Sequence, residues 1–575
     1  MEKVDKLSNL RHSLAHLLAA AVMELYPDTK RTIGPSIDNG FYFDFEFSEP
    51  ISDTDLPKIE KVMRKILPTW KNFEKHELSA DEAKKEYPNN PYKHELIDEF
   101  TQNGEKVTFY KSGDYWDLCK GGHAENMKDA PSDCFKLDRV AGAYWRGDEK
   151  NKMLTRIYGL AFENKKELDT YIVQREEAEK RDHKKLGREL GLLMFHETAP
   201  GMPYWLPKGL ILYKELENYW RKRHADLGYL EIASPLVNKS DLWKISGHWD
   251  HYKDDMFIAN MGENEVYGIK PMNCPNAMIV FKSMQVSYKD LPLRLSDTDR
   301  LHRYERSGVL NGLFRCRSFQ QDDSHNYVTE EMIAEEYRKI MEICKEFYGI
   351  FNLEYSFRLG TRPKEYLGDV ETWDKAEKAL HDVLEKSGKE YSVADGDGAF
   401  YGPKIDIIMK DAIGRDWQMG TIQLDFQQPR RFELEYTDKD GKKKTPVVIH
   451  RVIYGSLERF IGILIEHTAG AFPLWLSPVQ VKVIPVRANH NEYAKKVFEL
   501  LKENSIRAEL DDKDENLGTK VRDAKTNKIP YWIVIGDKEI ETEKVTLESR
   551  DSGTLGQISK EKLVMKLLEE IKNKK

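Results

Sequence analysis

The sequence predicts a multidomain α+β protein, and three observations lead to this fold class. The chain has 575 residues, which is more than one hydrophobic core usually holds. Helical and strand patterns mix without regular alternation up to about residue 160, whereas strands alternate with helices after residue 479. The composition, 40% hydrophobic and 33% charged, is typical of a folded chain rather than a disordered one.

The N-terminal 164 residues are predicted to form an α+β domain. Residues 10–26 carry apolar side chains at helical spacing, which predicts a helix with one buried face. Residues 41–47 place phenylalanine at every second position, which predicts a strand with one buried face. Residues 165–190 are dense in charge and poor in glycine, and we interpret them as a solvated helix that links two domains.

The rest of the chain divides into two further predicted domains. Residues 191–477 are richer in aromatic residues, glycine and proline, and contain strand-like runs at 404–409 and 421–426. Residues 478–575 are predicted to be a small α/β domain. Its expected strands lie at 479–486, 506–510 and 530–536, and its expected helices at 491–505 and 515–527.

Bulk properties limit the class of protein. The net charge of -8 gives no global sign of nucleic-acid binding, although an acidic protein can carry a local basic face. Five cysteines without a spacing pattern fit a reducing compartment better than a disulfide framework. The chain shows no signal peptide and no apolar run of about 18 residues, so we expect a cytoplasmic protein without a membrane segment.

The first candidate site for chemistry lies between residues 301 and 323. The chain contains no Walker-type phosphate loop, and the glycines of DGDGAFYG miss the dinucleotide-binding spacing. In LHRYERSGVLNGLFRCRSFQQDD, Arg303 and Glu305 would share one face of a strand, with Arg315 and Phe319 on the returning strand. Arginine can clamp a phosphate and phenylalanine can stack on a purine. A salt-bridged hairpin with no ligand is the alternative interpretation.

Two further motifs favour the nucleotide-binding interpretation of this hairpin. GSLERF places Arg459 on an expected helix after a glycine, and Pro235 follows an expected helix at 209–226. In this order the three segments resemble the signature motifs of class II aminoacyl-tRNA synthetases. The resemblance implies an antiparallel catalytic sheet that holds ATP with Mg²⁺, and a homodimer interface at Pro235. The implied ATP contacts are Arg303, Glu305, Arg315, Phe319 and Arg459.

Residues between these motifs are similar to those of the threonyl-tRNA synthetase family. KPMNCPNAM contains Cys274, QDDSHNY contains His325, and VVIHRVIYGSLERF contains His450. Cysteine and histidine are good zinc ligands, but these three are too far apart to form a metal motif by spacing. The resemblance implies that they bind one Zn²⁺. Valine lacks the hydroxyl with which threonine would fill the open coordination position.

The same resemblance assigns neighbouring residues to the reaction. Asp323 would accept the proton of the substrate hydroxyl. Tyr401 and Gln418 would contact threonine or its adenylate, and Gln321, Lys404, Arg303 and Arg459 would act in the activation step. Activation would be an in-line attack of the threonine carboxylate on the α-phosphate of ATP, helped mainly by positioning and charge.

A zinc site of this kind would not reject serine. The difference is one methyl group, worth about 1–3 kcal/mol, so a second, hydrolytic site is expected. His12 and His16 are i,i+4 neighbours, and Asp117, Cys119 and His123 lie in YWDLCKGGHAEN. Surface histidines or a metal site are the alternative interpretations. The motifs resemble the bacterial-type threonyl-tRNA synthetase editing domain, which implies that these five residues and Lys93 bind mischarged seryl-tRNA and activate water, without a metal.

The C-terminal domain resembles the class IIa anticodon-binding domain. Within GDKEIETEKVTLESRDSG, the expected anticodon readers are Lys538, Glu539 and Arg550, although Glu548 stands where the family pattern has an arginine. Many family members begin with a ubiquitin-like TGS domain that precedes the editing domain, and the sequence predicts that this chain lacks one. The partners implied are threonine, ATP and tRNA(Thr).

Two other functions fit parts of the pattern. A synthetase of the same subclass could activate proline or serine, but the Cys/His/His set and Asp323 argue against it. A synthetase-like regulator without activity would be expected to lose the motif arginines, and all three are present. The sequence therefore predicts a threonine–tRNA ligase that also hydrolyses seryl-tRNA(Thr).

Overall fold

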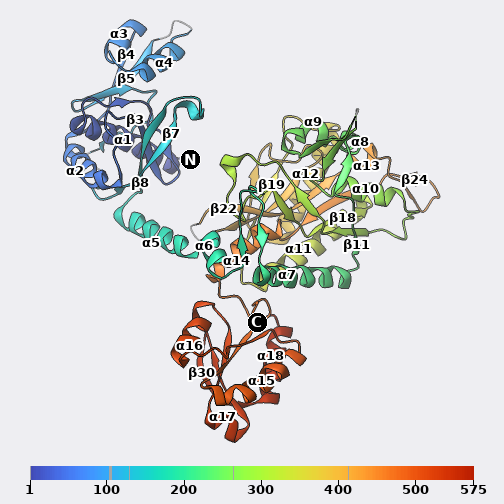
Figure 1. Cartoon of the computed structure of the whole chain (residues 1–575). Coiled ribbons are helices and arrows are strands. Elements are labelled where there is room, and N and C mark those ends of the chain that lie inside the picture. Colours follow the sequence, from blue (N-terminus) through green and yellow to red (C-terminus); the bar gives the residue numbers. More distant parts are fainter. Residues whose placement is uncertain (1, 103–105, 128–129, 263–264, 412–413) are drawn as a thin grey trace. The chain divides into compact units, whose positions relative to one another are not determined.

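The computed structural model describes residues 2–102, 106–127, 130–262, 265–411 and 414–575. The chain forms two compact units, Met1–Glu176 and Glu177–Lys575, which are described separately (Figure 1). The division falls inside the charge-dense stretch 165–190, and the bounds of the four predicted segments stay predictions. Among the described residues, no helix combines the length and the apolarity needed to cross a lipid bilayer.

The N-terminal unit packs a long helix against a sheet. Helix α1 (Glu2–Leu25) covers the predicted helix except for its last residue, Tyr26, and buries Leu14, Leu17 and Leu18 against Phe41 and other residues of one core. The sheet has the order β1-β3-β8-β7, and β2 also pairs with β3. Its strands are β1 (Lys30–Arg31), β2 (Ser36–Ile37), β3 (Gly40–Glu46), β7 (Phe135–Tyr144) and β8 (Met153–Ala161), and α2 (Leu56–Ile66) joins the same core.

The predicted alternation on β3 is confirmed, with one addition. Phe41, Phe43 and Phe45 are buried, as expected for the apolar face. Asp44, on the other face, is also buried, because Arg156 of β8 pairs with it at 2.6 Å. A buried carboxylate needs such a partner.

A second, three-stranded sheet in this unit carries several candidate site residues. Its order is β4-β5-β6, with β4 (Glu74–Leu78), β5 (Val107–Ser112) and β6 (Tyr115–Leu118). Helices α3 (Ala80–Lys85) and α4 (Pro91–Phe100) pack on it around Phe109 and Ile97. Lys93 lies on α4, Asp117 lies on β6, and Cys119 follows at the end of β6.

The charge-dense stretch forms two helices rather than the single helix predicted. Helix α5 (Lys165–Arg181) buries only Leu168 among its residues, as expected for a solvated helix. Asp182 then interrupts the helix, since its side chain accepts the backbone N–H groups of Lys184 and Lys185 at the start of α6 (His183–Glu189). An aspartate at this position is a strong N-cap, and this explains the break.

The second unit is built around an eight-stranded sheet in the order β11-β15-β18-β25-β22-β21-β19-β20. The central pairs are antiparallel, and only the edge pairs β11–β15 and β19–β20 are parallel. The strands are β11 (Leu230–Ile232), β15 (Leu293–Asp297), β18 (Asp323–Val328), β19 (Ser356–Gly360), β20 (Tyr391–Ala394), β21 (Lys404–Lys410), β22 (Asp416–Asp425) and β25 (Val447–Val452). The strand-like runs at 404–409 and 421–426 are therefore confirmed.

Helices and a hairpin complete the part of this unit that holds the site. Helices α7 (Pro207–Asp226), α11 (Ile333–Gly349), α12 (Val370–Ser387) and α14 (Leu457–Thr468) contribute to the largest core. The predicted hairpin is present as β16 (Arg300–His302) and β17 (Ser318–Gln320). Phe319 lies on β17 as predicted, but Arg303 and Glu305 follow the end of β16 and Arg315 precedes β17.

The C-terminal segment has the predicted α/β pattern. Its sheet has the order β27-β26-β28-β29-β30, in which β26 (Val481–Pro485) is parallel to both β27 (Ala508–Leu510) and β28 (Tyr531–Ile535). Strands β29 (Lys544–Ser549) and β30 (Gly553–Ser559) extend it antiparallel. The helices are α15 (Asn491–Glu503), α16 (Leu517–Thr526), α17 (Asp537–Thr542) and α18 (Lys560–Lys572).

Candidate functional sites

The three predicted metal ligands meet in the large sheet. Strands β18 and β25 are neighbours, and their register places His325 directly opposite His450. Cys274 is the first residue of α10 (Cys274–Lys282). One donor atom from each of these three buried residues lies within 4.8 Å of the other two. Folding thus brings together three residues that are 51 and 125 positions apart in the chain.

A carboxylate that the sequence did not reveal orients one of these ligands. Asp425, fully buried at the end of β22, places Oδ2 2.9 Å from Nε2 of His450. Its Oδ1 accepts the backbone N–H groups of Gln427 and Gln428 at 2.7 and 3.0 Å, which fixes the carboxylate. A metal-binding histidine usually donates its other ring N–H to a carboxylate in this way. The only signal in the sequence was the alternation of β22, which turns Gln423 and Asp425 away from Ile422 and Leu424.

The other two residues also fit a metal site. Within the described part of the chain, Nδ1 of His325 is buried without a hydrogen-bond partner. Burial and nearby His450 hold the pKa of His325 well below its usual range, so its ring is neutral and has a free lone pair. Burial also holds the pKa of Cys274 well above its usual range, as expected for a thiol that only a cation would ionise. A Cys/His/His set is a good zinc donor set.

Two predicted substrate contacts lie beside the triad. Asp323 is buried at the start of β18 and accepts a hydrogen bond from Nδ2 of Asn273 at 3.2 Å. Burial raises its pKa to about 6. The ring of Tyr401 lies 5.2 Å from that of His450, and its hydroxyl donates to Oε1 of Gln423. Asn273 and Gln423 were not among the predicted residues.

A second buried carboxylate connects two more predicted residues. Asp406 on β21 accepts a hydrogen bond from Nε2 of Gln418 at 2.7 Å and pairs with Nζ of Lys404 at 2.9 Å. Sequence reasoning missed Asp406, because an aspartate inside a strand-like run gives no distinct signal. Gln321 forms an isolated backbone bridge with Ser456, which caps α14.

Two of the motif arginines have defined positions: Arg303 lies beside the ring of Phe319, and Arg459 lies in the first turn of α14. The guanidinium of Arg303 lies 5.1 Å from the ring centre of Phe319, and its Nε donates to the carbonyl of Pro271, three residues before Cys274. Arg459 on α14 donates Nε to the carbonyl of Phe314 at 2.8 Å. Arg303 therefore connects Phe319 of the hairpin to the segment that leads into Cys274.

Arg315 and Glu305 pair at 2.9 Å. This is the salt bridge that the ligand-free interpretation of the hairpin predicts. The hairpin geometry by itself does not distinguish that interpretation from an ATP site.

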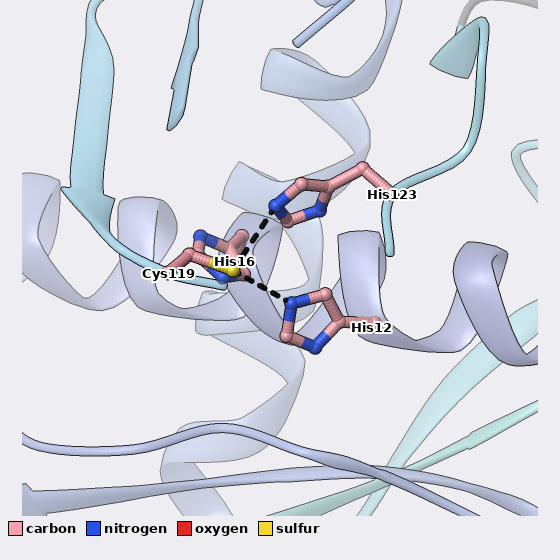
Figure 2. Close-up of side chains that lie close together, drawn as sticks. All are labelled: His12, His16, Cys119 and His123. Carbon is pink, nitrogen blue, oxygen red and sulfur yellow. Dashed lines mark hydrogen bonds between the residues drawn. The ribbon is translucent and has the colours of Figure 1, made fainter. Parts of the chain in front are cut away.

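In the N-terminal unit, the predicted histidine-rich cluster is also assembled (Figure 2). Sγ of Cys119 lies 3.1 Å from Nε2 of His12 and 3.3 Å from Nε2 of His123. His16 is buried on the same face of α1, one turn after His12. Donor atoms of all four residues lie within 4.8 Å of one another.

Beside this cluster lies a buried ion pair. Nζ of Lys93 is 2.8 Å from Oδ1 of Asp117, and both side chains are at most 2% exposed. Asp117 also accepts hydrogen bonds from the hydroxyls of Tyr87 and Tyr115, and Arg31 lies 3.4 Å away. These contacts hold the pKa of Asp117 below its usual range in spite of burial. With its oxygens occupied, Asp117 positions Lys93.

The cluster and the ion pair line the same cavity. It has a volume of about 390 Å³, and its wall includes His12, His16, Lys93, Asp117 and Cys119. His123 is not one of the lining residues; its Nε2 lies 3.3 Å from Sγ of Cys119, and its ring stacks on Phe73 with the ring centres 3.9 Å apart. All six predicted residues of this site are therefore neighbours, and the cavity could hold a small polar group.

The three predicted anticodon-reading residues differ in how many partners they already have inside the chain. Lys538 is exposed. Oε2 of Glu539 accepts the backbone N–H of Gly536, and Oε1 accepts the hydroxyl of Thr546. Arg550 donates to the carbonyls of Phe472 and Lys528 and pairs with Asp551. The structure thus gives Glu539 and Arg550 bonding partners inside the chain, and the anticodon assignment stays a prediction.

Three parts of the chain match family models of known proteins. A model described as "tRNA synthetase class II core domain (G, H, P, S and T)" matches residues 257–468. Models described as "Anticodon binding domain" and "Threonyl and Alanyl tRNA synthetase second additional domain" match residues 480–570 and 107–158. The antiparallel sheet with its motif arginines is thus a class II aminoacyl-tRNA synthetase core, and the predicted fold class is confirmed. Such a core implies ATP with Mg²⁺ as a substrate.

Whole-length relatives narrow the family. The threonine–tRNA ligase of Caldanaerobacter subterraneus subsp. tengcongensis is 51% identical over 98% of this chain and 87% of its own length. That of Clostridium botulinum strain Langeland is 52% identical over 98% of this chain and 89% of its own. A solved structure described as the RNA-binding domain of threonyl-tRNA synthetase from Cryptosporidium parvum Iowa II is 42% identical, with a TM-score of 0.66, over 68% of this chain and 98% of that one. The chain belongs to the threonine–tRNA ligase family.

Proposed function

We propose that this protein activates threonine with ATP, transfers it to the 3′ end of tRNA(Thr), and hydrolyses mischarged seryl-tRNA(Thr) at a separate site. The observation that carries the first part is the meeting of Cys274, His325 and His450 inside a class II synthetase core. The second part rests on the histidine-rich cavity of the N-terminal unit.

Zinc fits the Cys/His/His set. Asp425 fixes the proton of His450 on Nε2, so Nδ1 is the nitrogen left for a metal, and His325 offers a bare buried nitrogen. Zinc held there by three protein ligands would remain open to coordination by both the amino and the hydroxyl group of threonine, as five-coordinate zinc. Valine fills the same space without the hydroxyl, and an apolar pocket alone rejects such isosteres poorly.

The side chains around the triad would complete substrate recognition. Asp323 faces the site from the start of β18, with a pKa of about 6 that makes its carboxyl a good acceptor for the proton of a hydroxyl near neutral pH. Tyr401 would form the wall of the site next to His450. Its hydroxyl donates to Gln423, which fixes the position of the ring. Lys404 and Gln418 are held in place through the shared carboxylate Asp406.

Activation would depend on charge and position. Arg303 and Arg459 would bind phosphates of ATP, Arg315 and Glu305 would contact the nucleotide, and Phe319 would stack on adenine. Gln321 and Lys404 would orient the threonine carboxylate for in-line attack on the α-phosphate. The fixed cations would stabilise the charge that develops as pyrophosphate leaves.

The N-terminal cavity would perform the correction. Burial lowers the pKa of both His12 and His16, so each ring is neutral at pH 7 and can take a proton from water. Lys93, held by Asp117, would place a positive charge near the ester, and Cys119 and His123 would lie beside His12 and His16. A seryl group is small enough for a cavity of about 390 Å³.

The remaining assignments concern partners. We propose that the C-terminal segment binds the tRNA anticodon through Lys538 and neighbouring residues. A homodimer would form at Pro235, where Leu236 and Val237 are 41% and 51% exposed. We further propose a cytoplasmic location, with no membrane partner.

Amino-acid-dependent pyrophosphate exchange tests the activation step. We expect strong exchange with threonine, weaker exchange with serine and none with valine or proline. Valine exchange equal to that with threonine would contradict discrimination by the zinc site. Proline exchange above threonine exchange would instead support a different synthetase of the subclass.

Elemental analysis tests the metal at Cys274. We expect zinc at this site in the purified protein and its loss in Cys274→Ser, while Cys344→Ser serves as a control because Cys344 is buried in the same unit but is not one of the three clustered ligands. A Cys274→Ser variant that retains all of its zinc would refute the ligand set.

Deacylation of seryl-tRNA(Thr) tests the second site. In His12→Ala/His16→Ala we expect hydrolysis to fall at least tenfold while threonine-dependent exchange continues. The control is His76→Ala, an exposed histidine of the same unit. Unchanged deacylation in the double variant would remove this cavity from the mechanism.

A further inference from the structure

The proton on His123 can be located from its neighbour Ser13. The hydroxyl of Ser13 donates its single hydrogen to the carbonyl of Asn9 at 2.8 Å and accepts the backbone N–H of Ala124 at 2.9 Å. Toward Nδ1 of His123, 3.4 Å away, this oxygen can therefore only accept. Nδ1 carries the proton, and Nε2, which faces Cys119, has a bare lone pair.

His12 presents the same kind of nitrogen to the same sulfur. The backbone of Gly34 acts on its ring as a hydrogen-bond acceptor and opposes the burial that lowers the pKa of His12. With that proton toward Gly34, Nε2 of the neutral ring is bare where it meets Sγ of Cys119 at 3.1 Å. Two bare nitrogens therefore face one thiol, which has only one hydrogen to donate (Figure 2).

A second proton would not resolve this conflict easily. The ring of His123 stacks on Phe73 and on His12, with ring centres 3.9 and 4.6 Å apart, so little water can reach it to stabilise a second proton. The backbone N–H of Gly121 donates to Sγ of Cys119 at 3.2 Å, so the sulfur already accepts one hydrogen bond from the backbone. Nδ1 of His16, which is 3% exposed, also has no hydrogen-bond partner within the described part of the chain. The cluster thus has an excess of electron pairs and a shortage of protons.

A divalent cation satisfies all of these groups at once. Tetrahedral zinc has Zn–S bonds of about 2.3 Å and Zn–N bonds of about 2.0–2.1 Å, which separate sulfur from nitrogen by roughly 3.5 Å. The two sulfur–nitrogen distances in this cluster, 3.1 and 3.3 Å, need only a small expansion. Gly34 and Ser13 orient His12 and His123 through the ring nitrogen that points away from the sulfur, as partners of metal-binding histidines commonly do.

We propose that His12, His16, Cys119 and His123 bind one divalent transition-metal ion of the zinc class, and that this ion inhibits hydrolysis at the same cavity. Binding would form the sulfur–metal bond and release the thiol proton to solvent. Four protein ligands fill a tetrahedral site, as in structural zinc centres, and leave no position for a water nucleophile. The ion would also occupy the histidine nitrogens that take the proton of water. The inhibitory half rests on the proposed editing function, and the binding half does not.

Metal binding is tested on the full-length protein with zinc and with cobalt(II). At saturating zinc we expect two ions per chain, one of them lost in Cys119→Ala but retained in Cys134→Ala, a buried cysteine of the same unit outside the cluster. The cobalt(II) difference spectrum between the wild type and Cys119→Ala should show thiolate charge transfer and tetrahedral d–d bands. One ion per chain, lost in Cys274→Ser and unaffected in Cys119→Ala, would overturn the proposal.

Inhibition is tested separately by deacylation of seryl-tRNA(Thr) in buffered free zinc. We expect at least a tenfold fall in rate as the second ion binds, reversed by a chelator, with threonine-dependent exchange of the wild type unchanged. A rate that rises with zinc, or that stays constant while the second ion binds, would overturn the inhibitory half. Absence of hydrolysis in metal-free protein would count against the proposed editing function, and the stoichiometry would still decide the metal site.

Discussion

Asp425→Asn tests the role assigned to the carboxylate behind His450. Oδ1 of the new amide can still accept the N–H groups of Gln427 and Gln428, as the carboxylate does at 2.7 and 3.0 Å. The amide NH₂ then faces Nε2 of His450, where an acceptor stood at 2.9 Å. A donor at this position requires a bare Nε2, so the proton of the neutral ring moves to Nδ1, the nitrogen proposed to bind zinc.

The chain has two ways to respond, and both weaken zinc binding. If the amide keeps its orientation, the ligand nitrogen is protonated. If the amide flips, His450 is satisfied but two backbone N–H groups of buried residues lose their acceptor, at about 1–3 kcal/mol each. Loss of a second-shell partner typically weakens metal binding by about 10–100-fold, or about 1.4–2.8 kcal/mol. We therefore expect Asp425→Asn to bind zinc about 10–100-fold more weakly.

Competition with a chromophoric chelator measures this affinity directly on the full-length protein. Asp369→Asn is the matched control, because Asp369 also accepts a backbone N–H, that of Thr372 at 2.8 Å, but does so at the exposed start of α12. We expect wild-type affinity in the control. Zinc affinity of Asp425→Asn within twofold of the wild type would refute the orienting role of Asp425.

Three other changes test the remaining parts of the structure. Asp117→Asn leaves Lys93 buried without its counter-charge, so hydrogen exchange in α4 should report a loss of about 3–5 kcal/mol, and a loss below about 1 kcal/mol would contradict the buried pair. His123 has a folded-state pKa of about 3 against about 6.5 when unfolded, so only the unfolded chain binds its proton between these values. Stability of the N-terminal unit should therefore fall as pH drops below about 6.5, by about 2 kcal/mol at pH 5. This slope, measured by hydrogen exchange of α1, should be reduced in His123→Gln, and an equal slope would show that another group is responsible. Gly455→Ala places a Cβ 2.1 Å from the carbonyl of Met419 at a φ of +81°, so we expect a loss above about 1 kcal/mol and a higher KM for ATP, whereas unchanged values would exclude strain at the start of α14.

Local patterns predicted the elements of the fold where the two faces of a segment differ in chemistry. The alternation around Phe43 marks a strand because its apolar side chains can only be buried on one face. The division of 165–190 into two helices was not predicted, because charge density and low glycine content describe a helix but not where it is capped. The position of the break is set by Asp182, because its side chain accepts the first N–H groups of α6.

The site residues also fall into two groups, those that the sequence indicated and those that only the fold reveals. Cysteine and histidine are distinctive residues, so a family resemblance could assign Cys274, His325 and His450, and the fold brings them together. Asp406 and Asp425 are ordinary aspartates in strand-like runs. Their importance comes from complete burial next to groups that need a fixed acceptor, and this depends on the pairing of β21, β22 and β25, which no local pattern specifies.

The two Cys/His clusters show why donor type alone does not define what a site does. In the catalytic unit, the fixed carboxylate Asp425 accepts the proton of His450, and three ligands leave room for a substrate. In the N-terminal unit, Ser13 and the backbone of Gly34 orient the histidines, and a fourth donor closes the set. An open set suits recognition of a hydroxyl, whereas a closed set leaves a bound ion no free position. If water is to be activated in the N-terminal cavity, the histidine nitrogens must therefore remain free of metal, and this opposition makes the zinc dependence of deacylation a direct measure of how the cavity works.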